Sequence, residues 1–166
     1  MSRREQIRMS EAEAAAFLAE ERTVTCATSG PRGWPHLMPL WYVLRESPAD
    51  ESGPRLWAWT YAVSQKVRNI EREPKATLQV EAGEEYQLLR GVMLECDVVV
   101  HRELETVKAL GHEIFARYAS PRGQPPMELP AEVGLMVDKQ AAKRVALEFV
   151  ELRRASWDHR KLGAVY

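Results

Sequence analysis

Six segments of the chain alternate apolar or β-branched residues with polar ones, which is the period of a half-buried β-strand. They span residues 23–28, 35–44, 55–60, 76–82, 86–101 and 145–149. Turn-forming residues follow the first segment in Ser29-Gly30-Pro31-Arg32-Gly33 and separate the fourth from the fifth in Gly83-Glu84-Glu85. Hairpins of this kind predict an antiparallel sheet, and antiparallel strands of this number usually avoid exposed edges by closing into a barrel.

Four other segments have helical features and are expected to lie at the ends of the strands. Ser10 and Glu13 form a capping box at the start of the first, and Ser64 is placed to cap the second, which Pro74 ends. The helices are expected at 10–22, 65–73, 103–118 and 130–142, with a polar loop at 46–54 and a proline-rich loop at 120–130.

The charges of the helix after Ser64 run against its dipole. Lys66 and Arg68 lie near the positive end and Glu71 and Glu73 near the negative end, each misplaced charge costing about 0.3 to 1 kcal/mol. The Ser64 hydroxyl, the Lys66 ammonium and the free backbone N–H groups converge where a phosphate could sit. The alternative is a short, solvated helix whose charges carry little meaning.

Composition limits the possible partners. The 166 residues are 45% hydrophobic and 28% charged with a net charge of -1, which fits one globular domain over 1–166 and argues against a general nucleic-acid or membrane binder. The near-neutral net charge averages over two basic segments. Segment 64–75 has four bases and two acids, and segment 153–161 has four bases and one acid. Either segment could meet an anionic small molecule.

Location and redox state follow from two further features. No apolar run approaches the roughly 18 residues needed to cross a bilayer, so the cytoplasm is the expected location. Cys26 and Cys96 lie far apart in apolar surroundings without metal-ligand spacing. Both are expected to be reduced residues of the core, because free cysteine is among the most buried residue types.

No metal site or catalytic residue is predicted. His112-Glu113 begins like a zinc-protease motif, but the second histidine is missing. His36 could approach a substrate, although a strand histidine with a hydrogen-bond partner is the commoner case. Trp41, Trp57 and Trp59 could wall a planar ring, although large aromatic residues mostly fill cores and interfaces.

Several motifs together resemble one family. Thr60-Tyr61-Ala62-Val63-Ser64-Gln65-Lys66, followed by Asn69-Ile70 and Glu73-Pro74, resembles the phosphate-binding turn and helix of the pyridoxamine 5'-phosphate oxidase-like split-barrel flavoproteins. Residues 33–41 resemble the Gly-x-Pro-x-x-x-Pro second strand of that family, and Arg90-Gly91-Val92 resembles its long fifth strand. The tail at 156–163 is similar to the flavin- and deazaflavin-dependent branch, many members of which use coenzyme F420. The resemblance covers 23–166.

This resemblance implies a mainly β fold with peripheral helices, a six-stranded antiparallel split β-barrel that forms a homodimer with two cofactor sites at the subunit interface. An N-terminal helix within 1–22 and a C-terminal cap at 153–166 complete the single domain. The implied cofactor-binding residues are Met38, Pro39, Leu40 and Trp41 beside the ring, Thr60, Ser64 and Lys66 at the phosphate, Arg90 near the ring or its tail, and Trp157 and Arg160 in the cap. Gln65 stands where oxidases of the family commonly have arginine, so Arg68 or Arg72 would have to compensate, or the cofactor differs from FMN.

The resulting hypothesis is an oxidoreductase that transfers a hydride between F420 and a small organic acceptor. The alternatives are an FMN-dependent reductase or oxidase and a non-enzymatic protein that binds F420, FMN or haem, for which His36, His101 and His159 are the candidate axial ligands. The expected partners are a small-molecule substrate and a second copy of the chain, without nucleic acid or membrane.

Overall fold

The fold is built from seven β-strands and five α-helices within residues 2–46 and 53–163, the part of the chain that the computed structural model describes. The strands are β1 (Thr23–Ser29), β2 (Pro35–Trp41), β3 (Val43–Arg45), β4 (Arg55–Tyr61), β5 (Lys75–Ala82), β6 (Arg90–His101) and β7 (Arg144–Asp158). The helices are α1 (Arg3–Gln6), α2 (Glu11–Glu20), α3 (Gln65–Arg72), α4 (Leu104–Ala119) and α5 (Ala131–Ala141), with 3-10 turns η1 (Tyr86–Leu88) and η2 (His159–Leu162). The loop expected at 46–54 lies mostly outside the described residues.

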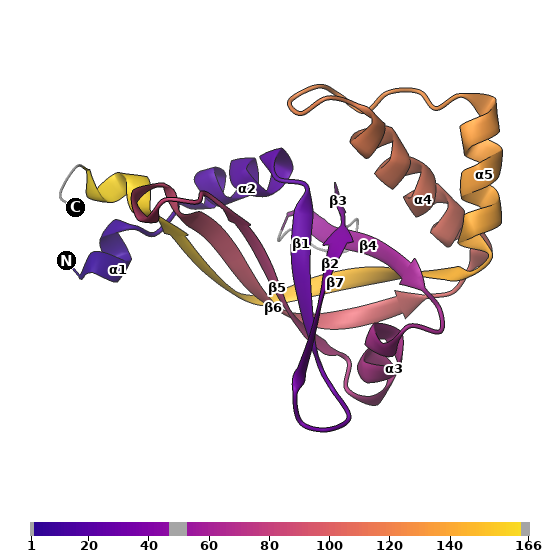
Figure 1. Cartoon of the computed structure of the whole chain (residues 1–166), viewed down its shortest axis with the longest axis horizontal. Helices are drawn as coiled ribbons and strands as arrows, with labels where there is room; N and C mark the ends of the chain where they lie inside the picture. The colour runs from indigo at the N-terminus through magenta and orange to yellow at the C-terminus, as the bar shows by residue number, and fades with distance from the viewer. Residues whose placement is uncertain (1, 47–52, 164–166) are drawn as a thin grey trace.

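All seven strands belong to one antiparallel sheet in the order β2-β1-β5-β6-β7-β4-β3 (Figure 1). Only Tyr42 separates the end of β2 from the start of β3. The two edge strands are therefore successive parts of one segment, which pairs with β1 on one side and with β4 on the other. This closure confirms the expected mainly β split barrel, with seven strands where six were predicted.

Tyr42 accounts for the extra strand. Its backbone N–H donates to the Tyr118 hydroxyl at 2.8 Å instead of to a neighbouring strand, which divides the segment predicted at 35–44 into two. Its own buried hydroxyl lies 2.6 Å from the carbonyl oxygen of Leu18 and 2.8 Å from that of Glu21. One residue thus joins the barrel to both α2 and α4.

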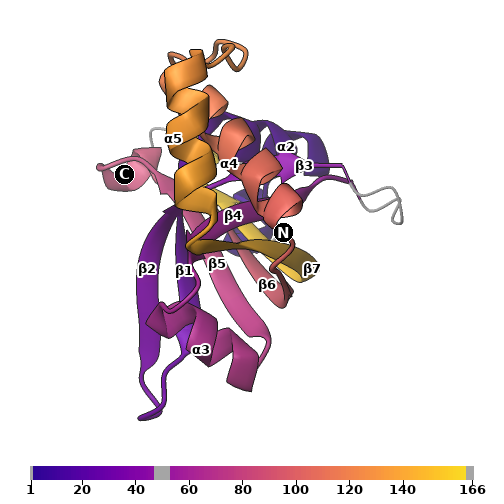
Figure 2. The ribbon, with the colours of Figure 1, turned by 90° about the vertical axis from the view of Figure 1, so that its right-hand side faces the viewer.

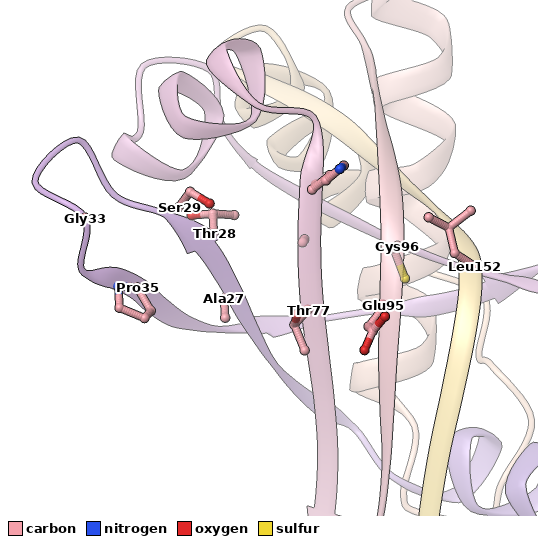
Figure 3. Close-up of a pocket in the computed structure, with 11 residues that line it drawn as sticks. Ala27, Thr28, Ser29, Gly33, Pro35, Thr77, Glu95, Cys96 and Leu152 are labelled. Atoms are coloured by element: carbon pink, nitrogen blue, oxygen red, sulfur yellow. The ribbon is translucent and has the colours of Figure 1, made fainter.

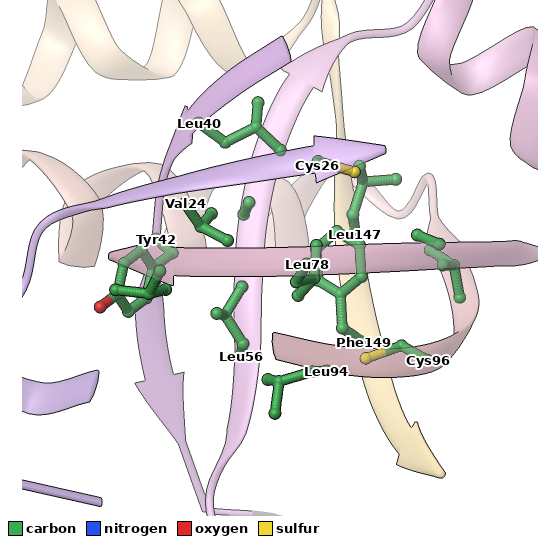
Figure 4. Packing of buried hydrophobic residues seen from close by; sticks show 14 of the residues in the cluster. Val24, Cys26, Leu40, Tyr42, Leu56, Leu78, Leu94, Cys96, Leu147 and Phe149 are labelled. Atoms are coloured by element: carbon green, nitrogen blue, oxygen red, sulfur yellow. The ribbon is translucent and has the colours of Figure 1, made fainter. Parts of the chain in front are cut away.

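The barrel interior is filled by aliphatic side chains that alternate along the strands. Figure 4 shows Leu78, Leu94, Leu147 and Phe149 packed together inside the barrel, and all are buried. Both thiols, Cys26 and Cys96, are free and buried in the same cluster, as predicted. A second cluster lies outside the barrel, where α4 and α5 cover β4 (Figure 2).

β6 and β7 form a long antiparallel pair that spans the molecule, with α4 and α5 connecting the two strands, and β7 is much longer than predicted (Figure 1). The last strand was expected at 145–149, whereas β7 continues to Asp158 and contains the first residues of the segment expected as a cap. Leu152 has no partner on β6, because the register shifts between Glu95 and Cys96, and its side chain is 61% exposed. The fifth segment, predicted at 86–101, begins instead with η1.

Local sequence signals account for most helix boundaries. Ser10 and Glu13 form the predicted capping box of α2, and Ser64 caps α3. Pro130 stands one position before α5 and not in its first turn. Among the described helices, none is long and apolar enough to cross a membrane; the cytoplasmic location remains a prediction.

Candidate functional site

The N-terminal turn of α3 brings together the three residues expected to hold a phosphate. Ser64 caps the helix, and its hydroxyl accepts the backbone N–H of Val67 at 3.4 Å. Thr60, near the end of β4, faces the same turn, and the Lys66 ammonium donates to its hydroxyl at 3.3 Å. Both Thr60 and Lys66 are buried, Lys66 with only 4% of its surface exposed. Sequence order and local folding therefore place two hydroxyls and one ammonium at a helix N-terminus.

Lys66 has no acidic partner among the residues that the structure describes. Within the described residues no carboxylate forms an ion pair with it, and Thr60 is its hydrogen-bond partner. Burial lowers the pKa of the ammonium below its ordinary value. Burial also raises the pKa of Cys26 to about 11, so this thiol is protonated at neutral pH and leaves the charge of Lys66 uncompensated. A buried ammonium of this kind is costly unless an anion joins it.

A buried polar network holds α3 against the barrel. Asn69 is fully buried, and its amide nitrogen donates to the Thr28 hydroxyl of β1 at 3.0 Å. Its amide oxygen accepts from the side chain of Gln65 at 2.8 Å. Gln65 thus helps to orient the helix, while Asn69 and Thr28 were not predicted as site residues. The signal for Asn69 was a polar residue between the buried Val67 and Ile70 positions, which alone does not identify its partner.

The strand expected to run beside a cofactor ring is largely open to solvent. Met38, Pro39 and Trp41 of β2 are exposed, whereas Leu40 points into the barrel core. The Trp41 ring stacks on Tyr118 of α4 with 4.3 Å between centroids. β2 therefore offers a flat aromatic surface backed by α4, and Leu40 belongs to the core beneath that surface.

The remaining predicted residues, Arg90, Trp157 and Arg160, lie where β6 begins and β7 ends, at the end of this strand pair away from α3. Trp157 covers Gly91, where a Cβ atom would come within 2.3 Å of its ring. Since β6 has 12 residues, roughly 35 to 40 Å of strand separates this group from the site at α3. One copy of the chain does not bring the two groups together.

The two arginines of that distant group already have carboxylate partners. Arg90 lies 3.3 Å from Glu20 and 3.7 Å from Glu21, with its guanidinium over the Phe17 ring. The Arg160 guanidinium donates to both oxygens of Asp158, at 2.8 and 2.6 Å. These contacts neutralise both charges within the chain.

Two cavities lie near the predicted site. One, of about 280 Å³, lies between the β1–β2 hairpin and α3 and is lined in part by Trp34, His36 and Gln65. The other, of about 600 Å³, opens on β1, β5 and β6, with Ala27, Thr77, Glu95 and Leu152 around it (Figure 3). Neither is lined by Lys66.

The candidate haem ligands differ in their contacts. His101 contacts Glu148 at 2.8 Å and stacks on Trp57, and Nδ1 of His159 lies 2.8 Å from the Tyr86 carbonyl oxygen. Nδ1 of His36 is buried and has no hydrogen-bond partner among the described residues. Those residues contain no group of three or more histidine, cysteine or acidic side chains that could hold a metal ion.

Comparisons with known proteins agree on the fold. The model of the family described as pyridoxamine 5'-phosphate oxidase matches residues 10–149. A conserved hypothetical protein from Mycobacterium tuberculosis, of solved structure, is 37% identical over 100% of this chain and 95% of that chain, with a TM-score of 0.81. No curated protein sequence matches the chain.

Two more distant solved structures share the fold alone. An F420 reductase is 20% identical over 89% of this chain and 98% of its own, with a TM-score of 0.61. HutZ, the haem storage protein from Vibrio cholerae, is 13% identical over 89% of this chain and 93% of its own, also with a TM-score of 0.61. Similar barrels therefore carry names that refer to different cofactors.

Proposed function

Because the chain belongs to the pyridoxamine 5'-phosphate oxidase family, we propose that it is an oxidoreductase that binds coenzyme F420 and transfers a hydride between this deazaflavin and a small organic acceptor. The observation that carries the proposal is Lys66, a buried ammonium at the N-terminus of α3 that has no carboxylate partner in the described part of the chain. A phosphate there would accept hydrogen bonds from Lys66 and Thr60 and interact favourably with the helix dipole.

The number of buried cations favours F420 over FMN, the alternative cofactor. FMN ends in a phosphate monoester with a charge of about -1.5 to -2 at neutral pH, whereas F420 carries a phosphodiester with a single negative charge. Gln65 adds no charge, and Arg72 of α3 is exposed and donates to the Ser29 carbonyl oxygen. Lys66 alone therefore matches the singly charged diester better.

A homodimer is part of the proposal. The groups at α3 and at Arg90, Trp157 and Arg160 can face one cofactor only if two copies of the chain contribute. Large apolar side chains are also exposed just before β2 and along it, and at the β7 bulge, namely Trp34, Leu37, Met38, Trp41 and Leu152. An apolar surface of this kind is typical of an interface.

A bound reduced deazaflavin supplies a hydride and a proton, so that a conjugated double bond of the acceptor becomes a single bond while the deazaflavin is oxidised. The chain's own residues bind the cofactor and orient it. Lys66 and Thr60 hold the anionic group, and Asn69 fixes α3 against β1. Trp41, backed by Tyr118, offers a flat apolar wall that excludes water from the ring.

Titration of the purified protein with F420, FMN and haem, followed by fluorescence and absorbance, tests this function. We expect F420 to bind most tightly and FMN more weakly. Failure to bind either flavin type would refute the proposal, and tight haem binding alone would favour the haem alternative. A protein that binds F420 but reduces none of a panel of enones and quinones would be a cofactor-binding protein and not an enzyme.

A further inference from the structure

Arg144, the first residue of β7, places its guanidinium over two aromatic rings of β4. It stands opposite Tyr61 in the β4–β7 register, and its guanidinium carbon lies 4.1 Å from the centroid of the Tyr61 ring and 4.5 Å from that of the Trp59 ring. We propose that Arg144 binds a carboxylate of the hydride acceptor, which is then a planar enone that also carries an acid group. This inference rests on the proposed function.

The guanidinium of Arg144 has no acceptor in the described part of the chain. It forms no ion pair or hydrogen bond with a described residue, and its Nε atom is buried without a partner there. Burial lowers the pKa of Arg144 below its ordinary value, but an arginine stays charged at neutral pH. The fold therefore holds a half-buried cation, an arrangement that is costly unless an anion joins it.

The other arginines that lie over aromatic rings in the described structure each have an acceptor. The Arg45 guanidinium lies 4.9 Å from the Trp57 ring and donates to both carboxylate oxygens of Glu113 at 2.7 Å. The remaining three have carboxylate or backbone carbonyl acceptors, namely Arg90 with Glu20, Arg22 with Ser120 and Arg117 with Ala19. A ring contact does not replace an acceptor for these residues, and Arg144 differs from all of them.

The C-terminus of α5 does not supply the acceptor that Arg144 lacks. This helix ends at Ala141, three residues before Arg144. The negative end of a helix dipole favours a nearby cation, but the effect is screened by salt and falls off within the last turn. Among the described residues, no backbone carbonyl oxygen accepts a hydrogen bond from Arg144.

A row of aromatic rings connects Arg144 with the wall at Trp41 that is proposed to face the deazaflavin ring. The Phe115 ring of α4 lies 6.4 Å from the Trp41 ring and 6.0 Å from the Trp59 ring, over which Arg144 lies. Trp41 and Tyr61, at the two ends of the row, are 50% and 47% exposed. An acceptor with its carboxylate at Arg144 would therefore extend along this row toward Trp41.

A carboxylate on a planar molecule matches this arrangement. A guanidinium can donate two parallel hydrogen bonds to one carboxylate, and exposed aromatic rings favour contact with another planar group. The reduction leaves the acid group unchanged, because one carbon of the conjugated C=C bond gains the hydride and the other gains a proton while the reduced deazaflavin is oxidised by two electrons. Arg144 therefore sets the position and the class of the acceptor without exchanging a proton with it.

Two enones that differ in a single group test the site. One is benzalacetone with a para carboxylate, and the other is benzalacetone with a para carboxamide. Isothermal titration calorimetry of the full chain in the presence of oxidised F420 measures their dissociation constants without turnover. We expect wild-type protein to bind the carboxylate about tenfold more tightly, the size of a charge-assisted hydrogen bond. Arg144→Gln should lose this preference and keep its affinity for the carboxamide.

Arg45→Gln is the matched control, because Arg45 also lies over a tryptophan ring but already has Glu113 as its partner. It should retain the preference. The inference is overturned if wild-type protein does not distinguish the two enones, if Arg144→Gln keeps the preference, or if Arg45→Gln abolishes it. Should circular dichroism show that Arg144→Gln is unfolded, the milder Arg144→Lys decides, since loss of the paired donors should reduce the preference and an unchanged preference would contradict the inference.

Rates with reduced F420 separate this inference from the proposed function. The values of kcat/KM for the two enones should differ in the same direction and by about the same factor as their affinities. If both enones are reduced with equal kcat/KM, the proposed function stands and the inference fails. If F420 does not bind and neither enone is reduced, the proposed function fails and the acceptor assignment fails with it, while calorimetry still shows whether Arg144 binds carboxylates.

Discussion

Two basic regions of the chain have similar charge and opposite surroundings. Segment 153–161 has four bases, and each contacts a carboxylate of the same chain. Segment 64–75 also has four bases, yet Lys66 is buried and pairs with no acid within residues 2–46 and 53–163. A local excess of positive charge therefore indicates an anionic ligand only where the chain has not already supplied the anions. The charges of the first region are already paired within the fold, and the charge of Lys66 in the second is available for an anion.

The largest effect is expected from Lys66→Met, which keeps most of the side-chain volume and removes the charge. Affinity for the cofactor should fall at least tenfold, about 1.4 kcal/mol. The free energy of unfolding without ligand should stay constant or rise by about 1 kcal/mol, because an unpaired buried charge is lost. Ligand titration and urea unfolding measure the two quantities.

Lys139→Met is the control for this comparison, because Lys139 is an exposed residue of α5 far along the chain from the site. It should change neither the affinity nor the stability. Unchanged cofactor affinity in Lys66→Met would remove Lys66 from the phosphate site and make the two basic regions equivalent.

Asp158→Asn should lower the free energy of unfolding by about 1 to 2 kcal/mol. It should change the affinity of the phosphate site at Lys66 of the same subunit only slightly, which is the reverse of the result expected for Lys66→Met. Hydrogen bonds from Arg160 lower the pKa of the buried Asp158 carboxyl below its ordinary value, although burial opposes them. A carboxyl with a lowered folded-state pKa stabilises the protein above its unfolded-state pKa, and this contribution disappears as the pH falls through the folded-state pKa.

The acid part of the pH profile therefore separates Asp158→Asn from wild-type protein. Wild-type protein should lose the Asp158 contribution as the pH falls below about 4, whereas Asp158→Asn lacks this contribution at every pH. The stability difference between the two proteins should shrink in acid. A difference that stays constant down to the lowest pH at which both fold would show that the ion pair does not stabilise the fold. Urea unfolding at a series of pH values makes the measurement.

The smallest effect is expected from Arg153→Ala. The Arg153 side chain is 68% exposed and lies 3.4 Å from Glu95. Exposed ion pairs contribute about 0 to 1 kcal/mol, so thermal unfolding should shift only slightly. A loss of stability as large as that of Asp158→Asn would mean that the exposure of an ion pair in segment 153–161 does not determine how much it stabilises the fold.

Short-range features of the fold could be predicted from the sequence. Alternation predicted β1 and β4 within one residue, and the Ser10 capping box and Ser64 predicted the starts of α2 and α3. These features depend on residues a few positions apart. β7 was underestimated because the alternation of apolar residues ends near Phe149, and the rest of the strand is held by pairing with β6.

The candidate site was predictable in part, for a related reason. The motif identified Thr60, Ser64 and Lys66, which lie within seven residues of one another. The burial of Lys66 depends on packing against β1, and Asn69 of the same helix reaches Thr28, 41 residues earlier in the chain. Glu11, which pairs with Arg154 in addition to the local Glu151, lies 143 residues away, and Glu13, which pairs with Lys161, lies 148 residues away. Pairing over such separations cannot be deduced from local charge order.

The buried Tyr42 side chain lies at the junction of β2 and β3, where the barrel closes, and this has a consequence for how the molecule opens. Tyr42 contacts the end of α2 through its hydroxyl and α4 through its backbone. Separating either helix from the barrel breaks hydrogen bonds at the position where β2 becomes β3. Helix α2, the β2–β3 junction and α4 therefore form one cooperative unit, whose amide protons should exchange with solvent through a shared opening.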